Sequence, residues 1–276
     1  MRLGEAKFVV FDVETTGLMP EAGDRIVEIA AIKVEGNSIV GEFNSLINCG
    51  IPVSREAFAV NNISRDMLKN APLPSEVIPE FLDFVKDSAL FAYNANFDAG
   101  FLRQEAALIG RKTDELLIID ILAMARILLP GLGKYSLLFV AAHFGLTHTQ
   151  KHRALEDVKM SLDVLFKLFN ILRRKQLDDF SYLLKIFSIN KNLNNRMLSE
   201  RMAEIQEALD LGKTIDIKYF SLIRGEVTER KVIPKKVLKQ DGRDYLVGYC
   251  YLREEERFFR IDGILRLEIS GQGAKV

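Results

Sequence analysis

The sequence has little of what marks secreted, membrane-bound or metal-knuckle proteins. It contains two cysteines, Cys49 and Cys250, in 276 residues. Cysteines so few and so far apart exclude a metal knuckle and a disulfide framework, so we expect both to be reduced packing residues. No run reaches about 18 uncharged apolar residues, and the N-terminal segment lacks the apolar core of a signal peptide. We therefore expect a cytoplasmic protein without a membrane segment.

The chain also lacks net charge, with 38 basic and 38 acidic side chains. That balance hides an asymmetry: residues 1–170 hold 17 Lys and Arg against 22 Asp and Glu, and residues 171–276 hold the other 21 and 16. An acidic first part suits a cation site, and a basic second part suits a polyanion. Hydrophobic content of 48% and charged content of 28% exclude disorder and indicate one or two globular domains.

Short apolar runs alternate with helical patterns through the first part of the chain. The predicted strands cover residues 8–11, 26–34, 38–47, 90–94 and about 117–119. A Gly-Asn hairpin turn joins the second strand to the third, and a loop rich in Pro and Asn follows the third. Amphipathic helices separate the later strands, and a long helix covers residues 154–175. This order predicts a mixed sheet flanked by helices.

Two acids interrupt the first strand where it ends. Asp12 and Glu14 follow four apolar residues, and because strand side chains alternate with period two, both carboxylates point to the same side. Two like charges held so close persist when they share a proton or hold a cation between them. An ordinary acidic turn after the strand is the alternative.

Three further sites carry possible chemistry. Asp98 stands at the start of a predicted helix, where it could simply interact with the helix dipole. His152 lies in a polar loop, and Asp157 follows five residues later at the start of the long helix, so both can face one site. Asp120, an acid in an apolar run, is expected to cap the helix that it precedes.

The three segments FDVETTG, NANFD and HRALED resemble, in order and spacing, the motifs of the DnaQ-like DEDDh 3′-to-5′ exonucleases, the group of the DNA polymerase III epsilon subunit. The resemblance covers residues 5–174 and implies an α/β, RNase H-like domain over residues 1–174. It implies that two divalent cations, Mg²⁺ or Mn²⁺, are held by Asp12, Glu14, Asp98 and Asp157. His152 would then be the general base, since its H-x4-D spacing favours the histidine class over the tyrosine class.

The resemblance also implies contacts with the substrate. Backbone N–H groups of Thr15, Thr16 and Gly17 would meet the last nucleotide, and Leu18 would press on its base. Phe97 would form a wall of the nucleotide channel, with packing under its own helix as the alternative. Asn94 matches an Asn of the second motif, whereas Tyr93 stands where the family often has His.

Residues 175–210 are predicted to form a helical linker with an Asn- and Lys-rich break at residues 190–195. Within it, Gln176–Phe180 weakly resembles the short peptides that dock on sliding clamps, although its fourth residue is acidic where that pattern is apolar.

From Lys213 the apolar period becomes two, which predicts a small barrel over residues 211–276. Its strands resemble the WYL domain, an SH3-like barrel, with Asp244 in place of the namesake Trp and Gly263 in place of a common Arg. Arginine forks bind phosphates and aromatic rings stack on bases, so this module is expected to bind nucleic acid or a nucleotide. The ligand candidates are Tyr219, Arg230, Tyr245, Arg257, Phe259 and Arg260. The alternative places the aromatic rings in the barrel core and the arginines on the surface.

Together these patterns predict an enzyme that releases nucleoside monophosphates from the 3′ end of single-stranded or frayed DNA, with a WYL module that binds or senses nucleic acid. The alternatives left open are an exonuclease for RNA or short oligonucleotides and a non-catalytic, nucleic-acid-binding regulator. A DNA polymerase or a sliding clamp is a further expected partner.

Overall fold

The computed structural model describes residues 2–147 and 152–273, and the chain forms two compact units. The first unit consists of Met1–Ile171 and Phe187–Asn190, and the second consists of Leu172–Ile186 and Lys191–Val276. Among the described residues, no helix is both long enough and apolar enough to cross a membrane.

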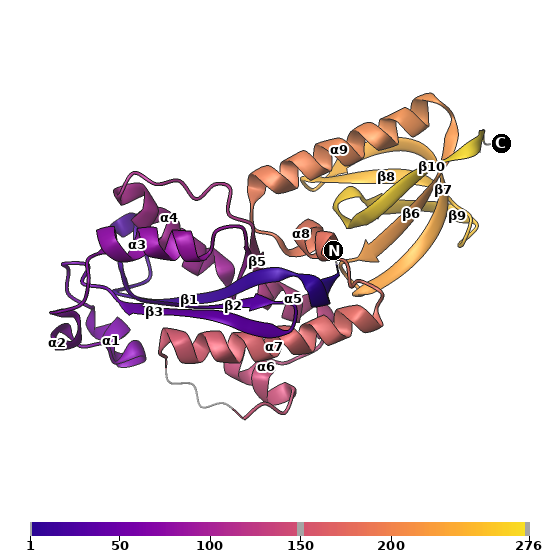
Figure 1. The fold of residues 1–276 in the computed structure, drawn as a ribbon. Coiled ribbons are helices and arrows are strands. Elements are labelled where there is room, and N and C mark those ends of the chain that lie inside the picture. Colours follow the sequence, from indigo (N-terminus) through magenta and orange to yellow (C-terminus); the bar gives the residue numbers. More distant parts are fainter. Residues whose placement is uncertain (1, 148–151, 274–276) are drawn as a thin grey trace. The chain divides into compact units, whose positions relative to one another are not determined.

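A five-stranded mixed sheet forms the centre of the first unit (Figure 1). Its strands, in sheet order, are β3 (Ser38–Leu46), β2 (Ile26–Glu35), β1 (Lys7–Thr15), β4 (Ala89–Ala92) and β5 (Ile118–Asp120). The first three strands form an antiparallel meander, whereas β4 and β5 run parallel to β1. The sheet is the mixed, helix-flanked sheet that the sequence predicts.

Strand β1 is buried on both faces, and its side chains divide between two helical layers. Odd-numbered Phe11 packs in a core with Phe81 of α3 (Pro74–Phe84) and with residues of α4 (Ala95–Leu108). Even-numbered Phe8 instead contacts Phe166 and Phe169 of α7 (Ala154–Arg174) on the opposite face. Figure 1 shows α3 and α4 on one side of the sheet and α7 on the other. The alternation therefore directs the even-numbered residues of β1 toward α7.

The remaining helices of this unit are short. They are α1 (Arg55–Asn61), α2 (Arg65–Leu68), α5 (Ile121–Leu128) and α6 (Leu137–His143), together with the 3₁₀ turns η1 (Leu3–Glu5) and η2 (Pro20–Ala22). Asp120 caps α5 as predicted, because its carboxylate accepts the N–H groups of Leu122 and Ala123. Helix α1 lies in the segment predicted as a loop. The Ser54 hydroxyl caps its start, and seven residues are too few for a clear helical period.

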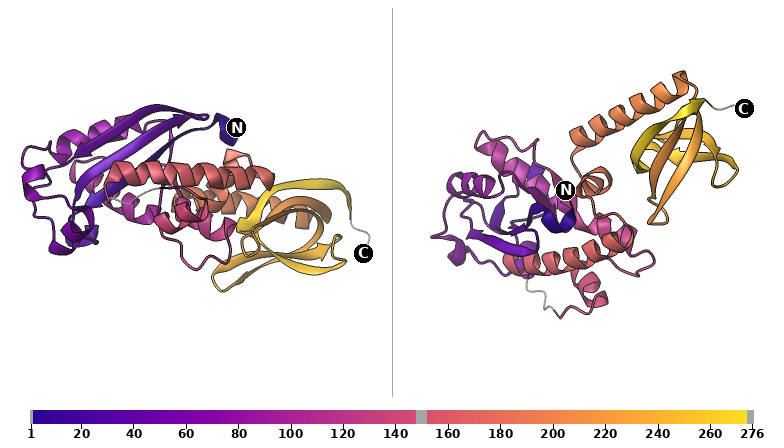
Figure 2. Two further views of the ribbon diagram at one scale, coloured as in Figure 1. Left: turned by 90° about the horizontal axis from the view of Figure 1, so that it is seen from below. Right: turned by 45° about the vertical axis from the view of Figure 1, so that its right-hand side comes forward.

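A five-stranded antiparallel sheet forms the second unit, and its strands curve around one another (Figure 2). In sheet order the strands are β10 (Ile264–Gly273), β6 (Lys213–Ser221), β7 (Glu226–Gln240), β8 (Arg243–Cys250) and β9 (Glu255–Arg260). Helix α8 (Phe180–Phe187) precedes the sheet, and η3 (Ile261–Gly263) separates β9 from β10. This sheet agrees with the small β module predicted from the period-two pattern.

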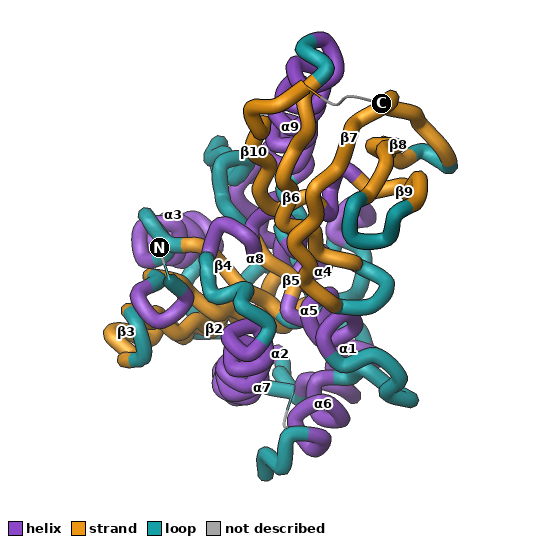
Figure 3. The backbone as a smooth tube through the Cα atoms, turned by 90° about the vertical axis from the view of Figure 1, so that its right-hand side faces the viewer, coloured by secondary structure: helices purple, strands orange, loops and turns teal. Residues whose placement is uncertain are grey.

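Helix α9 (Lys191–Asp210) covers one side of this sheet, and Figure 3 shows it beside β10. Its buried residues Ile205 and Ala208 join the core of Ile215, Val232 and Leu246. The predicted break at residues 190–195 is wrong, because the helix begins at Lys191 and includes the Asn-rich stretch. Packing of its apolar side against the sheet outweighs the low helix propensity of those asparagines.

Candidate active site

Three carboxylates from two elements meet at the end of β1. Ligand oxygens of Asp12, Glu14 and Asp157 all lie within 4.8 Å of one another, and we call these three residues the carboxylate cluster. Asp12 and Glu14 are even-numbered residues of β1, so they face α7, and Asp157 lies in the first turn of that helix. The structure thus joins residues that lie more than 140 positions apart in the sequence.

Asp98 borders the cluster from the first turn of α4. Its side chain is buried, and its Oδ1 accepts a hydrogen bond of 3.1 Å from the Val13 N–H. Burial raises the pKa of Asp98 to about 8, and its charge contributes to the raised pKa of Asp12. Asp98 is therefore tied to the backbone of the strand that carries the cluster.

The electrostatics of the cluster favour a bound cation. Burial, followed by the charges of Asp98 and Glu14, raises the pKa of Asp12 well above its usual value. Burial and the charge of Asp157 raise the pKa of Glu14 to about 8, although a hydrogen bond with Asn61 partly opposes this. An all-oxygen set of mutually repelling carboxylates, of which Asp157 is buried and Asp12 and Glu14 are partly buried, is the donor set of a hard divalent cation such as Mg²⁺ or Mn²⁺. The residues present therefore fit a divalent metal.

His152 lies two residues before α7, with its side chain partly exposed. Its φ of +46° lies in the left-handed region, which is uncommon for a residue other than glycine. The backbone carbonyl of the next residue, Arg153, accepts the N–H groups of Glu156 and Asp157 at 3.0 and 3.1 Å. His152 and Asp157 thus flank the same helix start, as the sequence predicts for two groups that serve one site.

The turn between β1 and β2, residues 16–25, contains three of the predicted contacts for the last nucleotide, Thr16, Gly17 and Leu18, and we call it the substrate turn. Thr15 and Thr16 are buried, and the Thr16 N–H donates to the Arg25 carbonyl at 2.9 Å. That N–H group therefore donates within the turn, and its contact with a nucleotide stays a prediction. Leu18 is 78% exposed, as a side chain that presses on a base requires.

Asp24 holds the substrate turn together, and nothing in the sequence pattern indicated it. Its carboxylate accepts the Thr16 hydroxyl at 3.1 Å and the Met19 N–H at 3.0 Å. A Cβ atom on Gly17 would lie 2.3 Å from Asp24 Oδ2, so a larger residue here would displace this carboxylate and its hydrogen bonds. The carboxylate of Asp24 therefore lies directly against the glycine that follows the two threonines.

Besides Asp98, the second motif contains two predicted substrate contacts, Asn94 and Phe97. Asn94 is exposed and has a φ of +66° at the start of α4. Phe97 is partly buried, and its ring centroid lies 5.0 Å from that of Phe101, which favours packing under its own helix. The Tyr93 hydroxyl donates to the Tyr135 carbonyl at 2.7 Å, so this residue braces the segment before α6.

Two further residues near the cluster escaped the sequence reasoning. Asn61 donates its side-chain N–H to the Thr15 carbonyl at 3.2 Å and accepts the Ile63 N–H, which ties α1 to the end of β1. Glu28, on β2, lies opposite Glu14 in the strand register and is 1% exposed. An acid inside the apolar run IVEIAA was a visible signal for Glu28, and the segment NNISRDML, which weakly resembles the same family, begins at Asn61.

The second unit contains a separate cavity of about 290 Å³ along β6, β7 and β9. Four of the six predicted ligand residues line it: Tyr219, Arg230, Arg257 and Phe259. The other two do not line it, and Arg260 instead forms an ion pair with Asp262.

The cavity wall also explains one departure from the WYL pattern. A Cβ atom at Gly263 would lie 2.7 Å from the Phe220 carbonyl oxygen and 2.9 Å from the Tyr219 ring. An arginine therefore does not fit at this position.

The predicted clamp-docking segment is not available for docking in this fold. Leu177 and Phe180, the two apolar side chains of Gln176–Phe180, are buried. The Gln176 carbonyl accepts the Lys218 ammonium group at 2.9 Å, which fixes the segment within the second unit. The side chains that would enter a partner's groove instead belong to the core of this chain.

Comparison with known proteins finds two families that match separate parts of the chain. A family model described as Exonuclease matches residues 9–165, and a model of the WYL domain matches residues 200–269. The DNA polymerase III subunit epsilon of Treponema pallidum is 38% identical over 159 residues, which cover 57% of this chain and 74% of that protein. The DNA polymerase III PolC-type protein of Thermotoga maritima is 34% identical over 237 residues, or 83% of this chain.

The chain spans only part of its PolC-type relatives, 17% of the Thermotoga maritima protein and 12% of that from Caldanaerobacter subterraneus subsp. tengcongensis. Among solved structures, the nuclease domain of 3′hExo, a DEDDh family member bound to rAMP, has a TM-score of 0.53 at 17% identity. That match covers 60% of this chain and 92% of the other, and it shows the shared fold. The chain therefore belongs to the Exonuclease family, and a WYL domain follows its nuclease domain.

Proposed function

We propose that this chain is a metal-dependent exonuclease that releases nucleoside monophosphates from the 3′ end of single-stranded or frayed DNA. The observation that carries the proposal is the convergence of Asp12, Glu14 and Asp157 beside the substrate turn. These carboxylates and Asp98 would hold two divalent cations, which would supply activation of a water molecule and stabilisation of the leaving oxygen of a phosphodiester. The mutual repulsion of the carboxylates suits them to that role.

His152 takes the proton of the attacking water in this proposal. An imidazole is the side chain best suited to accept a proton near neutral pH, and His152 lies two residues before the helix whose first turn carries Asp157. The exposed Leu18 and the neighbouring Met19 present apolar surface to the terminal base, which allows weak sequence preference.

The preference for DNA rests on the relatives. Both the epsilon subunit and the PolC-type proteins are named as parts of DNA polymerase III. The same names support a polymerase as a partner, while the burial of Leu177 and Phe180 removes the basis for clamp docking by that segment. A cytoplasmic location is part of this proposal and agrees with two buried free thiols, Cys49 and Cys250.

We also propose domain limits for the nuclease (residues 1–174), the connecting helices (175–210) and the WYL domain (211–276). The end of α7 at Arg174 supports the first limit. The end of α9 at Asp210 coincides with the second, although α9 itself packs on the sheet of the second unit.

A panel of 5′-labelled oligonucleotides tests the proposed substrate. With Mn²⁺ or Mg²⁺, the full chain is expected to shorten single-stranded DNA stepwise from the 3′ end and to shorten RNA of the same sequence more slowly. A 3′-phosphorothioate strand is the control for direction and should resist digestion. Faster loss of RNA would establish the RNA alternative, and intact strands from a folded protein would establish a non-catalytic regulator.

The cavity of the second unit is proposed to hold phosphates and bases of a single strand. Arg230 and Arg257 supply guanidinium groups, and the T-shaped pair of Tyr219 and Phe259, with ring centroids 5.3 Å apart, supplies aromatic surface. Glu226 also lines the cavity and offsets one of these charges.

Arg257→Ala is expected to weaken binding of a labelled single-stranded oligonucleotide about tenfold, as the loss of one phosphate contact predicts. Fluorescence anisotropy with a 3′-blocked strand measures this. Arg253→Ala removes an exposed arginine of the turn after β8 that does not line the cavity, and it should leave binding unchanged. Equal losses in both variants would show a diffuse charge effect and would contradict a site in the cavity.

A further inference from the structure

Glu28 connects the sheet to the start of α7. It lies opposite Glu14 in the register of β1 and β2, and its carboxylate makes three contacts with two successive residues. Oε1 and Oε2 accept the Arg153 guanidinium at 2.7 and 3.0 Å, and Oε2 also accepts the Ala154 N–H at 3.1 Å. Glu28, a residue only 1% exposed, therefore binds both the residue before α7 and the first residue of the helix.

These contacts fix the geometry on both sides of the helix start. The Arg153 carbonyl accepts the N–H groups of Glu156 and Asp157, so the position of Arg153 sets the first turn that carries Asp157. His152 immediately precedes Arg153 and has a left-handed φ of +46°. Such backbone strain persists only where surrounding contacts hold the segment in place.

We propose that Glu28 and Arg153 are positioning residues that hold His152 and Asp157 against Asp12 and Glu14. The inference rests on the proposed hydrolysis, because it assigns these two residues to that site. The charge of Glu28 adds to the repulsion on Asp12 and Glu14, and the paired guanidinium of Arg153 offsets part of it. Neither residue reacts; their contribution is the alignment of the groups that do.

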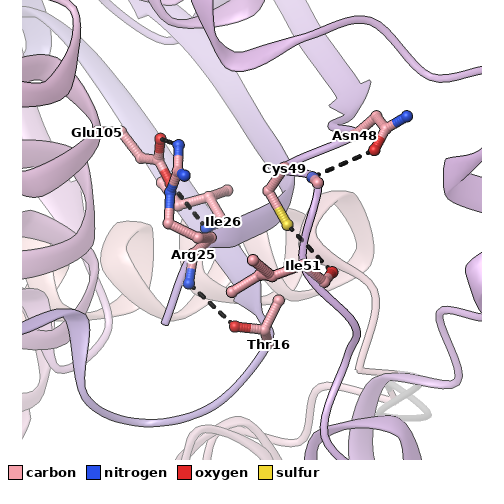
Figure 4. Close-up of polar contacts among 8 residues, drawn as sticks. Thr16, Arg25, Ile26, Asn48, Cys49, Ile51 and Glu105 are labelled. Carbon is pink, nitrogen blue, oxygen red and sulfur yellow. Dashed lines mark hydrogen bonds and ion pairs between the residues drawn. The ribbon is translucent and has the colours of Figure 1, made fainter. Parts of the chain in front are cut away.

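The chain offers a matched control in a second ion pair of the same form (Figure 4). Arg25 and Glu105 pair at 2.7 Å through both guanidinium contacts, Glu105 is 1% exposed, and it also accepts the Ile26 N–H. This pair joins the start of β2 to α4, and Arg25 also meets Thr16 of the substrate turn. Its loss should disturb the substrate turn and stability without moving α7.

The test compares Glu28→Gln, Arg153→Gln and Arg153→Lys with Glu105→Gln. Each variant is assayed for kcat and KM on a single-stranded oligonucleotide, for Mn²⁺ affinity by calorimetry and for melting temperature. All three variants of the Glu28–Arg153 pair are expected to lower kcat and Mn²⁺ affinity about 10- to 100-fold, with KM nearly unchanged. Glu105→Gln should lower the melting temperature by about as much as the variants of the Glu28–Arg153 pair do. It should also raise KM, but it should leave the Mn²⁺ affinity unchanged.

The two Arg153 variants distinguish the loss of alignment of the site residues from a change of charge near the cluster. Arg153→Gln leaves an extra negative charge near the cluster, so a charge effect alone would tighten Mn²⁺ binding, whereas loss of alignment weakens it. Arg153→Lys keeps the positive charge but loses the two-point contact of the guanidinium with Glu28. A kcat and an Mn²⁺ affinity near those of the parent would therefore overturn the proposal.

Parental kcat and Mn²⁺ affinity in Glu28→Gln below its melting temperature would also overturn it. If the parent binds Mn²⁺ but hydrolyses nothing, the proposed function fails, while the affinity measurements still decide the positioning role.

Discussion

Asp12→Asn is expected to lower the rate of 3′-end hydrolysis by at least about 10³-fold while preserving the fold. Asp12 is a partly buried member of the carboxylate cluster, and the amide keeps its shape but removes the charge that a divalent cation requires. The measurement is release of the terminal nucleotide from a single strand at saturating Mn²⁺. Circular dichroism and the melting temperature verify that the variant is folded.

Glu42→Gln is the control for this variant. Glu42 is an exposed residue of β3 outside the cluster, so its replacement also removes one negative charge but should leave the rate within about twofold. An Asp12→Asn protein that digests as fast as Glu42→Gln would disprove the role of the cluster.

The metal-free protein is expected to lose stability as the pH rises from about 4.5 to about 8, and Mn²⁺ should restore it. The folded-state pKa of Glu14 is about 8 against an ordinary value of 4.5, and that of Asp98 is also about 8. Because the folded state binds these protons more tightly than the unfolded state, the free energy of unfolding falls as they leave. A divalent cation replaces the protons and removes the repulsion.

Thermal unfolding with EDTA or with excess Mn²⁺ measures this effect. At pH 8 the cation should raise the melting temperature of the nuclease unit by about 5 °C or more, and at pH 5 it should have little effect. Asp12→Asn should melt higher than the parent at pH 8 in EDTA, since one of the repelling charges is gone, and should respond weakly to Mn²⁺. A melting temperature independent of both pH and metal would contradict the cluster's proposed electrostatics.

Much of the fold and the central part of the site follow from local patterns. Strand periodicity placed Asp12 and Glu14 on one face, and the structure confirms that this face meets the helix that carries Asp157. The predicted cap at Asp120 is confirmed because capping depends on a few neighbouring residues. These features are set within single elements, so the sequence reveals them.

Features that depend on contacts between distant segments were missed or misplaced. Glu28 acquires its role from Arg153, which lies 125 residues away. Asp24 shapes the turn through a close approach to Gly17 that residue type alone does not reveal. The asparagines at the start of α9 were read as a break because local propensity ignores the sheet on which that helix packs. Tertiary packing decided each of these cases.

The division of β1 between two helical layers also limits how the sequence can change. Inserting or deleting one residue between Phe8 and Asp12 would keep the aromatic ring beneath α7 but turn both carboxylates toward α3 and α4. Substitutions within the strand can be compensated by repacking, whereas a change in its length cannot. Length variation in descendants of this chain should therefore fall in the turns beyond Thr15 and not within β1.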